Sequence, residues 1–170
     1  MNGRQSISIA VLTENQDDVE LINSALRDAG HAAHCHWISS SNGLADTLVA
    51  EMVELLVLNC DRYSDSIRQV VKQKDRYNPE VPVIAMQEQA NEQDIETAMR
   101  AGACDLVSMG LKNRLQSVVS RELRALRVER ALNSTLQSAT VYKKHLKHHM
   151  AASASSYALV QEGIFTDVND

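Results

Sequence analysis

The chain has 170 residues, 44% of them hydrophobic, which permits one domain of ordinary size with an appendage. No apolar run approaches the roughly 18 residues that a membrane-spanning helix requires, and the polar start does not resemble a signal peptide. The formal net charge of -5 is unevenly spread, because residues 1–110 carry 8 basic and 17 acidic side chains whereas residues 111–150 carry 9 and 2. We therefore expect an acidic body and a basic tail.

Five short apolar runs alternate along the chain with segments of helical periodicity. Runs that are apolar throughout are typical of strands buried on both faces of a parallel sheet. The predicted strands are ISIAVL (7–12), HCHWI (34–38), ELLVLN (54–59), VPVIAM (81–86) and DLVSM (105–109). The pattern predicts an α/β fold with a doubly wound, five-stranded parallel sheet.

The helices between these strands have readable ends. The first stops at Gly30, and the fourth runs from a good N-cap, Asn91, to Gly102, because glycine tolerates the left-handed conformation of a helix end. The second, Leu44–Met52, and the third, Ser66–Lys74, have a weaker pattern with one apolar side each.

One long helix is predicted for Lys112–Met150, which contains no glycine or proline. Its first turns offer apolar side chains to the sheet: Leu115, Val119, Leu123 and Leu126. Later positions recur at alternating steps of four and three, as in a coiled-coil seam: Val128, Leu132, Thr135, Ala139, Tyr142, Leu146 and His149. Two of these are polar, so the seam suits a weak or partner-dependent coiled coil, and we expect a homodimer through its apolar members.

Three cysteines, an odd set without CxxC spacing, argue against a disulfide framework. Cys35, Cys60 and Cys104 each lie in an apolar stretch, so we interpret them as reduced, buried thiols. Their pattern favours a cytoplasmic protein.

Polar residues follow the predicted strands at the edge where parallel α/β sheets gather their functional groups. The candidates are Thr13 and Glu14, Asn59, Gln87 and Glu88, and Met109. The order of elements, with LTEN, LLVLNCD, PVIAMQE and AGACDLVSMG, resembles the receiver domain of bacterial response regulators, a flavodoxin-like fold, over residues 6–126. In that family these places hold two magnesium-binding acids, the phosphorylated aspartate, a Thr or Ser switch, and a lysine.

By this resemblance the pocket is degenerate, and Glu14 alone retains the expected chemistry. Asn59 carries an amide, which cannot form an aspartyl phosphate, and one remaining carboxylate is a poor magnesium site. We expect no phosphorylation, no metal, no cofactor and no enzymatic activity. Two alternatives stay open: Asp61 as an irregular acceptor, displaced by roughly 6–7 Å along the strand, and a generic α/β domain in which Asn59 has no special role.

Three segments, AGACDLVSMG, RELRALRVERALNSTL and YALVQEGIFTDVND, resemble the N-terminal region of FimX-type regulators of type IV pili. In that family a degenerate receiver precedes a PAS domain and degenerate GGDEF and EAL domains concerned with cyclic di-GMP. The resemblance implies a receiver-like domain at 1–127, a connector helix at 128–152 and the start of a PAS domain at 153–170. It further implies dimerisation, localisation at the cell pole or docking of pilus proteins in twitching motility, with the cyclic di-GMP site in the EAL domain.

Two groups of histidines could suggest a metal site, and a basic helix face could suggest a nucleic-acid interface. In each case we favour an ordinary surface role. The histidines could hold a metal, but their spacing fits a polar strand edge and a solvated helix surface: His31, His34 and His36, and His145, His148 and His149.

The basic face could bind nucleic acid, but no helix-turn-helix or aromatic platform accompanies it: Arg114, Arg121, Arg124, Arg127, Arg130, Lys143, Lys144 and Lys147. We therefore predict that it pairs with the acidic body or an acidic partner. No phosphate loop, GxSxG elbow or HExxH helix is present.

Overall fold

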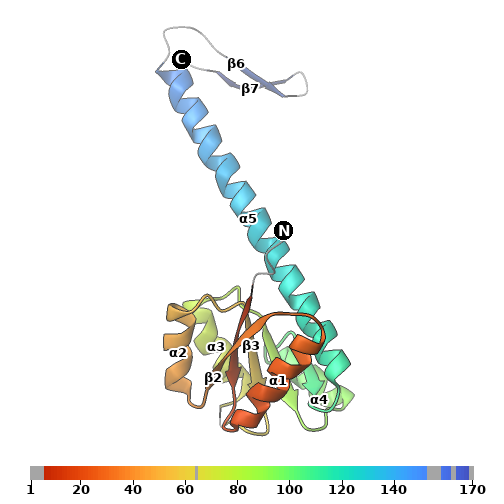
Figure 1. Cartoon of the computed structure of the whole chain (residues 1–170). Coiled ribbons are helices and arrows are strands. Elements are labelled where there is room, and N and C mark those ends of the chain that lie inside the picture. The colour runs from red at the N-terminus through yellow and green to blue at the C-terminus, as the bar shows by residue number, and fades with distance from the viewer. Residues whose placement is uncertain (1–5, 64, 153–157, 162–163, 169–170) are drawn as a thin grey trace. The chain divides into compact units, whose positions relative to one another are not determined.

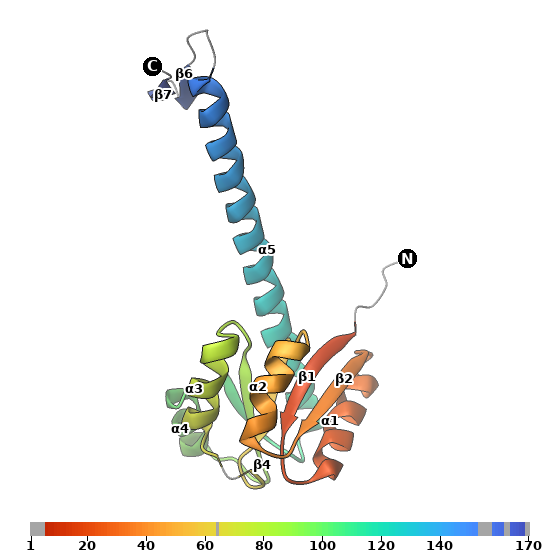
Figure 2. The same ribbon diagram turned by 90° about the vertical axis from the view of Figure 1, so that its left-hand side faces the viewer.

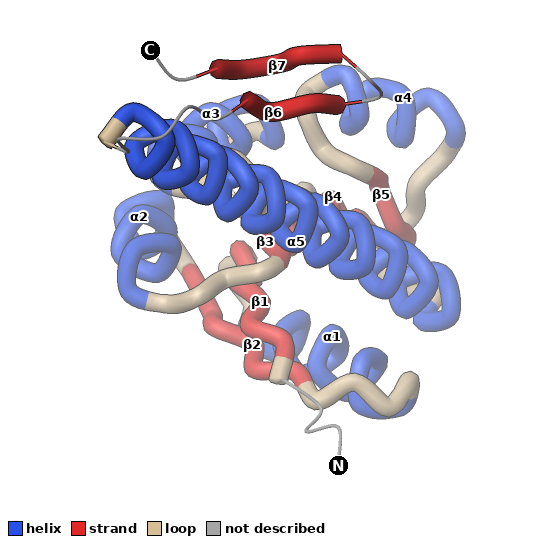
Figure 3. Tube along the Cα trace, turned by 90° about the horizontal axis from the view of Figure 1, so that it is seen from above, coloured by secondary structure: helices blue, strands red, loops and turns tan. Residues whose placement is uncertain are grey.

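The chain divides into two compact units, Met1–Leu126 and Arg127–Asp170. A computed structural model describes residues 6–63, 65–152, 158–161 and 164–168. The first unit contains five strands: β1 (Ile7–Leu12), β2 (Ala33–Ile38), β3 (Leu55–Asn59), β4 (Val83–Gln87) and β5 (Asp105–Ser108). They form one parallel sheet in the order β2-β1-β3-β4-β5, which Figure 3 shows from above. The predicted doubly wound parallel sheet is confirmed.

Helices cover both faces of this sheet: α1 (Gln16–Asp28), α2 (Ser41–Ala50), α3 (Ile67–Tyr77), α4 (Glu92–Arg100) and α5 (Lys112–Ala151). Helix α1 and the start of α5 pack on one face, where β1 and β3 contribute alternate residues such as Val11 and Val57. Helices α2, α3 and α4 pack on the other, over Leu12, Leu58 and Ala85 (Figures 1 and 2). All five residues of β3 are buried, as expected for a central strand covered on both sides.

Local sequence explains where the helices begin and end. Asn91 accepts a hydrogen bond from the main chain of Asp94, whose side chain bonds back to the cap, so this N-cap is confirmed. Ser66 caps α3 in the same way. Gly30 and Gly102 follow α1 and α4 with φ of 77° and 107°, a backbone conformation that other residues rarely adopt.

The long helix predicted after Gly110 is confirmed as α5. Its predicted sheet-facing residues, Leu115, Val119, Leu123 and Leu126, are all buried. The predicted PAS opening at 153–170 falls partly outside the described residues. Its described parts are two antiparallel strands, β6 (Ala158–Gln161) and β7 (Ile164–Val168).

The three cysteines are free and half-buried, which fits the interpretation of reduced thiols but with less burial than expected. Burial raises the pKa of Cys35 and that of Cys60 to about 11, so both thiols stay protonated and weakly reactive at neutral pH. In the described part of the chain, no helix combines the length and apolar character needed to cross a membrane.

Candidate functional site

Thr13 and Asn59 lie side by side where β1 and β3 end. The two strands pair in parallel with Leu12 opposite Leu58, so the residues that follow them meet at the same edge of the sheet. Both side chains are buried, with exposed fractions of 0% for Thr13 and 3% for Asn59. Two buried polar side chains need hydrogen-bond partners, and both find the same one.

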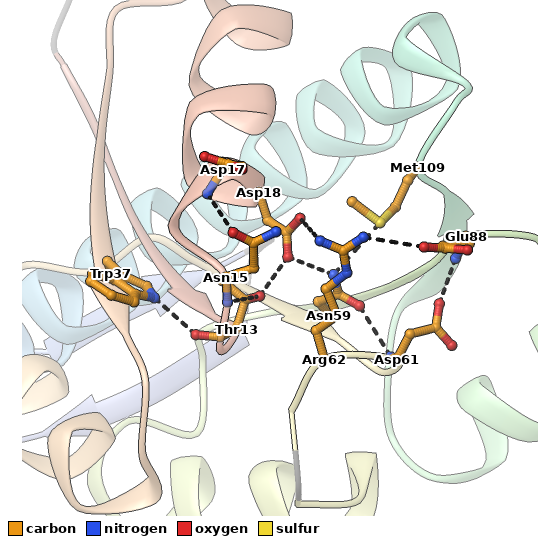
Figure 4. A network of polar contacts seen from close by, with 10 residues as sticks. All are labelled: Thr13, Asn15, Asp17, Asp18, Trp37, Asn59, Asp61, Arg62, Glu88 and Met109. Carbon is orange, nitrogen blue, oxygen red and sulfur yellow. Dashed lines mark hydrogen bonds and ion pairs between the residues drawn. The ribbon is translucent and has the colours of Figure 1, made fainter.

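That partner is Asp18, in the first turns of α1 (Figure 4). Its carboxylate oxygen Oδ2 accepts a hydrogen bond from Thr13 Oγ1 at 2.5 Å and one from Asn59 Nδ2 at 2.7 Å. Asp18 is only 4% exposed. The centre of the site is therefore a buried carboxylate held by a hydroxyl and an amide.

Asp18 is not among the residues predicted from the sequence. Glu14, predicted as the one carboxylate left in the pocket, is exposed and contacts the site through its main chain, whose N–H donates to the carbonyl of Arg62 at 2.6 Å. A signal was present: Asp18 precedes Ile22 by four residues and Ala25 by seven, so it lies on the apolar stripe of α1. A charged residue on a buried stripe requires hydrogen-bond partners or an opposite charge nearby.

Arg62, in the loop after β3, supplies the positive charge of the site. Its Nη1 lies 3.5 Å from Asp18 Oδ1 and its Nη2 lies 3.2 Å from Glu88 Oε1, so the guanidinium bridges α1 and the loop after β4 (Figure 4). The Asp18 side chain is 5% exposed and that of Glu88 is 67% exposed. Burial of Asp18 therefore shields its ion pair with Arg62 from solvent, whereas water and salt screen the ion pair between Arg62 and the exposed Glu88.

The other predicted residues lie around this centre in different ways. The sulfur of Met109 is 3.5 Å from Asn59 Nδ2 and stands at the edge of the site without a charge. Gln87 points to the start of α4, where its amide donates to the carbonyl of Gln89 at 2.6 Å and to Asp94 Oδ2 at 3.1 Å. The structure therefore brings Thr13, Asn59 and Met109 together and turns Gln87 toward α4.

Asp61, the alternative acceptor, is exposed and already engaged. Its main-chain N–H donates to Asn59 Oδ1 at 3.1 Å, and its own carboxylate accepts from the Glu88 N–H at 2.6 Å. On the other side, the indole of Trp37 donates to the carbonyl of Thr13 at 2.8 Å. Each of these contacts fixes a loop at the rim of the site.

The arrangement offers no carboxylate at the end of β3 to attack a phosphoryl group, since Asn59 presents an amide that donates to Asp18. The positive charge facing Asp18 is the guanidinium of Arg62. Within the residues that the structure describes, no group of three or more His, Cys, Asp and Glu side chains is placed to hold a metal ion.

The histidines of the first unit have separate partners. His31 Nε2 lies 3.1 Å from Ser120 Oγ, and His36 Nε2 lies 3.0 Å from Ser8 Oγ on the neighbouring strand. The rings of His34 and His36 are in edge contact, and burial together with the charge of His34 lowers the pKa of His36. His34 and His36 lie on the edge strand β2, whereas His31 precedes this strand and contacts α5.

Part of the basic helix face pairs with the body, as predicted. Arg114 and Arg121 on α5 lie 3.0 and 3.2 Å from the two carboxylate oxygens of Asp105, a buried residue at the start of β5. These two arginines therefore form ion pairs within the domain.

Comparison with known structures identifies the fold as that of a response-regulator receiver domain. The chain is similar to NtrX of Brucella abortus in complex with ADP, with a TM-score of 0.64 and 19% identity over 77% of this chain and 29% of NtrX. It is also similar to a CheY-like receiver domain protein of Methanospirillum hungatei, with a TM-score of 0.59 and 13% identity over 74% of this chain and 99% of that one.

A third similar structure is a putative pilus assembly-related protein of Burkholderia pseudomallei, with a TM-score of 0.59 and 16% identity over 73% of this chain and 94% of that one. At these identities the likeness concerns the fold alone. No family model and no curated protein matched the sequence. The comparisons therefore assign the first unit to the receiver fold.

Proposed function

We propose that this chain is a pseudo-receiver that signals through contacts with other proteins and not through phosphoryl transfer. The observation that carries the proposal is the buried amide of Asn59, which stands at the end of β3 and donates its hydrogen to Asp18 at 2.7 Å. An amide nitrogen whose lone pair is delocalised and whose hydrogen is committed to a carboxylate is not a nucleophile.

Two further features support the proposal. Asp18 is itself an unsuitable acceptor because it is 4% exposed and both of its oxygens have partners. Met109 faces Asn59 with a thioether, which supplies no positive charge to stabilise a phosphoryl group in transfer. The nucleophile and the cation of the reaction are thus both missing from the strand ends.

The proposal is tested by incubating the protein with radiolabelled acetyl phosphate and Mg²⁺. We expect no incorporation into the wild-type chain, in either acid-stable or acid-labile form. A receiver domain that retains its aspartate serves as the positive control in the same assay. Incorporation that disappears in Asp61→Asn would reject the proposal and support the irregular acceptor.

We further propose that the second part of α5 joins two copies of the chain. Most apolar seam residues of this stretch are exposed, with 62% for Val128, 57% for Leu132 and 71% for Tyr142. Such a stripe at coiled-coil spacing is costly to leave in water and pairs well with a copy of itself. The dimer would hold two receiver-like units together without any phosphorylation event.

The resemblance to FimX-type regulators supports a finer version of this proposal. In that version the module lies at the cell pole, docks proteins of the type IV pilus machinery, and is followed by a PAS domain and by domains concerned with cyclic di-GMP. The receiver fold of a putative pilus assembly-related protein is compatible with this version. Localisation of the tagged chain in cells of its source tests it: a diffuse signal would contradict the polar role.

A further inference from the structure

Glu88, in the loop between β4 and α4, is held at two points by consecutive residues of another loop. Its main-chain N–H donates to the carboxylate of Asp61 at 2.6 Å, and its own carboxylate lies 3.2 Å from the guanidinium of Arg62. Figure 4 shows both contacts reaching Glu88 from the loop that follows β3. Two contacts from one short segment fix the main chain as well as the side chain.

The rest of this loop is tied down equally. The Ala90 N–H donates to Ser108 Oγ of β5 at 3.0 Å. The amide of Gln87 reaches forward to the carbonyl of Gln89 and to Asp94, which also takes part in the capping of α4. Each of these contacts bears on the residues that lead into the first turn of α4.

Arg62 connects this loop to the buried centre. Besides Glu88 it faces Asp18, and its carbonyl accepts from the Glu14 N–H at 2.6 Å. A buried carboxylate is unfavourable without a nearby positive charge, and a guanidinium stays charged over the whole working pH range. The charge that Asp18 requires is therefore supplied by the chain itself and is always present.

We propose that Arg62 is the positioning residue of this site: its fixed charge neutralises Asp18 and holds the β4–α4 loop in a single position. The surface at the start of α4 is then presented permanently, without phosphate, metal or proton uptake. This inference rests on the proposed function, because only a module that does not switch by phosphorylation gains from a constant internal cation.

The test is amide hydrogen exchange at Glu88 and Ala90 in the full chain. Arg62→Met removes the charge-assisted contact with the Glu88 side chain. The loop should then open more often, and exchange at both amides should become about tenfold faster. Arg62→Lys keeps the charge and should restore most of the protection. The matched control is Arg68→Met, an exposed arginine in the first turn of α3, which should leave both rates unchanged.

Wild-type exchange rates in a folded Arg62→Met protein would overturn the proposal, and so would equal effects of Met and Lys. If Arg62→Met does not fold, Glu88→Gln replaces it, since it weakens only the exposed arm of the bridge. Faster exchange at Glu88 then supports the proposal, and an unchanged rate overturns it. The phosphate assay is read independently: labelling of the wild-type chain rejects the proposed function, whereas unchanged exchange without labelling rejects only the role of Arg62.

Discussion

Helix α5 contains two stretches of similar composition with opposite surroundings. In residues 112–126, Leu115, Val119 and Leu123 have exposed fractions of 1%, 0% and 3%, whereas farther along Val128 and Leu132 have 62% and 57%. Both stretches carry apolar residues at helical spacing and lack glycine and proline. The comparison shows that periodicity identifies an apolar face, while the element available to cover it decides whether the face is core or a surface for a partner.

The largest expected effect is that of Leu123→Ala in the covered stretch. The change removes a buried side chain from the cluster formed with β1, β3 and α1, and it should lower the free energy of unfolding by about 2–5 kcal/mol. Trp37, the single tryptophan of the chain, lies on β2 and reports unfolding of this unit by fluorescence.

Leu132→Ala is the matched control for this experiment. Because Leu132 is mostly exposed, its truncation should change the unfolding free energy by less than about 0.5 kcal/mol at protein concentrations where the chain is monomeric. Equal losses for the two variants would mean that the exposed stretch is also part of the folded core.

Self-association should depend on the second stretch of α5 and on one of its faces. Leu132 and Val141 have similar exposures of 57% and 54%, but they lie nine residues apart, which at about 3.6 residues per turn puts them on opposite sides of the helix. Leu132→Glu should convert the dimer to a monomer in sedimentation experiments, and Val141→Glu should not.

Truncation after Arg127 extends this test. The compact first unit ends at Leu126, so the shortened chain should fold and sediment as a monomer. A dimer that survives both the truncation and Leu132→Glu would relocate the interface to the globular unit.

Much of the fold could be predicted because each element has a local signal. Short, mostly apolar runs marked the five strands, and Asn91, Gly30 and Gly102 marked helix ends through their own backbone chemistry. These signals involve residues close together in the sequence. The second and third helices were the weakest predictions. They correspond to α2 (Ser41–Ala50) and α3 (Ile67–Tyr77), and the predicted helices differ from these only at the ends.

The candidate site could be predicted only in part. Thr13, Asn59 and Met109 follow from strand order, since parallel strands end at one edge of the sheet. Arg62 could not be found in this way, because its partners Asp18 and Glu88 are 44 and 26 residues away and the pairing depends on two loops. Gln87 turned toward α4 because the main chain and Asp94 there offer it two acceptors.

The smallest expected effect is the change in stability when one exposed basic side chain of α5 is neutralised. It should differ between the two stretches of this helix. Arg121 is 56% exposed and lies 3.2 Å from Asp105, which keeps Arg114 and the Leu106 N–H as further partners. Arg121→Gln should therefore lower the unfolding free energy by only about 0.2–1 kcal/mol, and the difference should shrink with added salt. Lys143→Gln, an exposed change in the second stretch, should leave the Trp37 transition unmoved at any salt concentration. A salt-independent loss in Arg121→Gln larger than about 2 kcal/mol would mean that Asp105 behaves as a buried charge dependent on this one arginine.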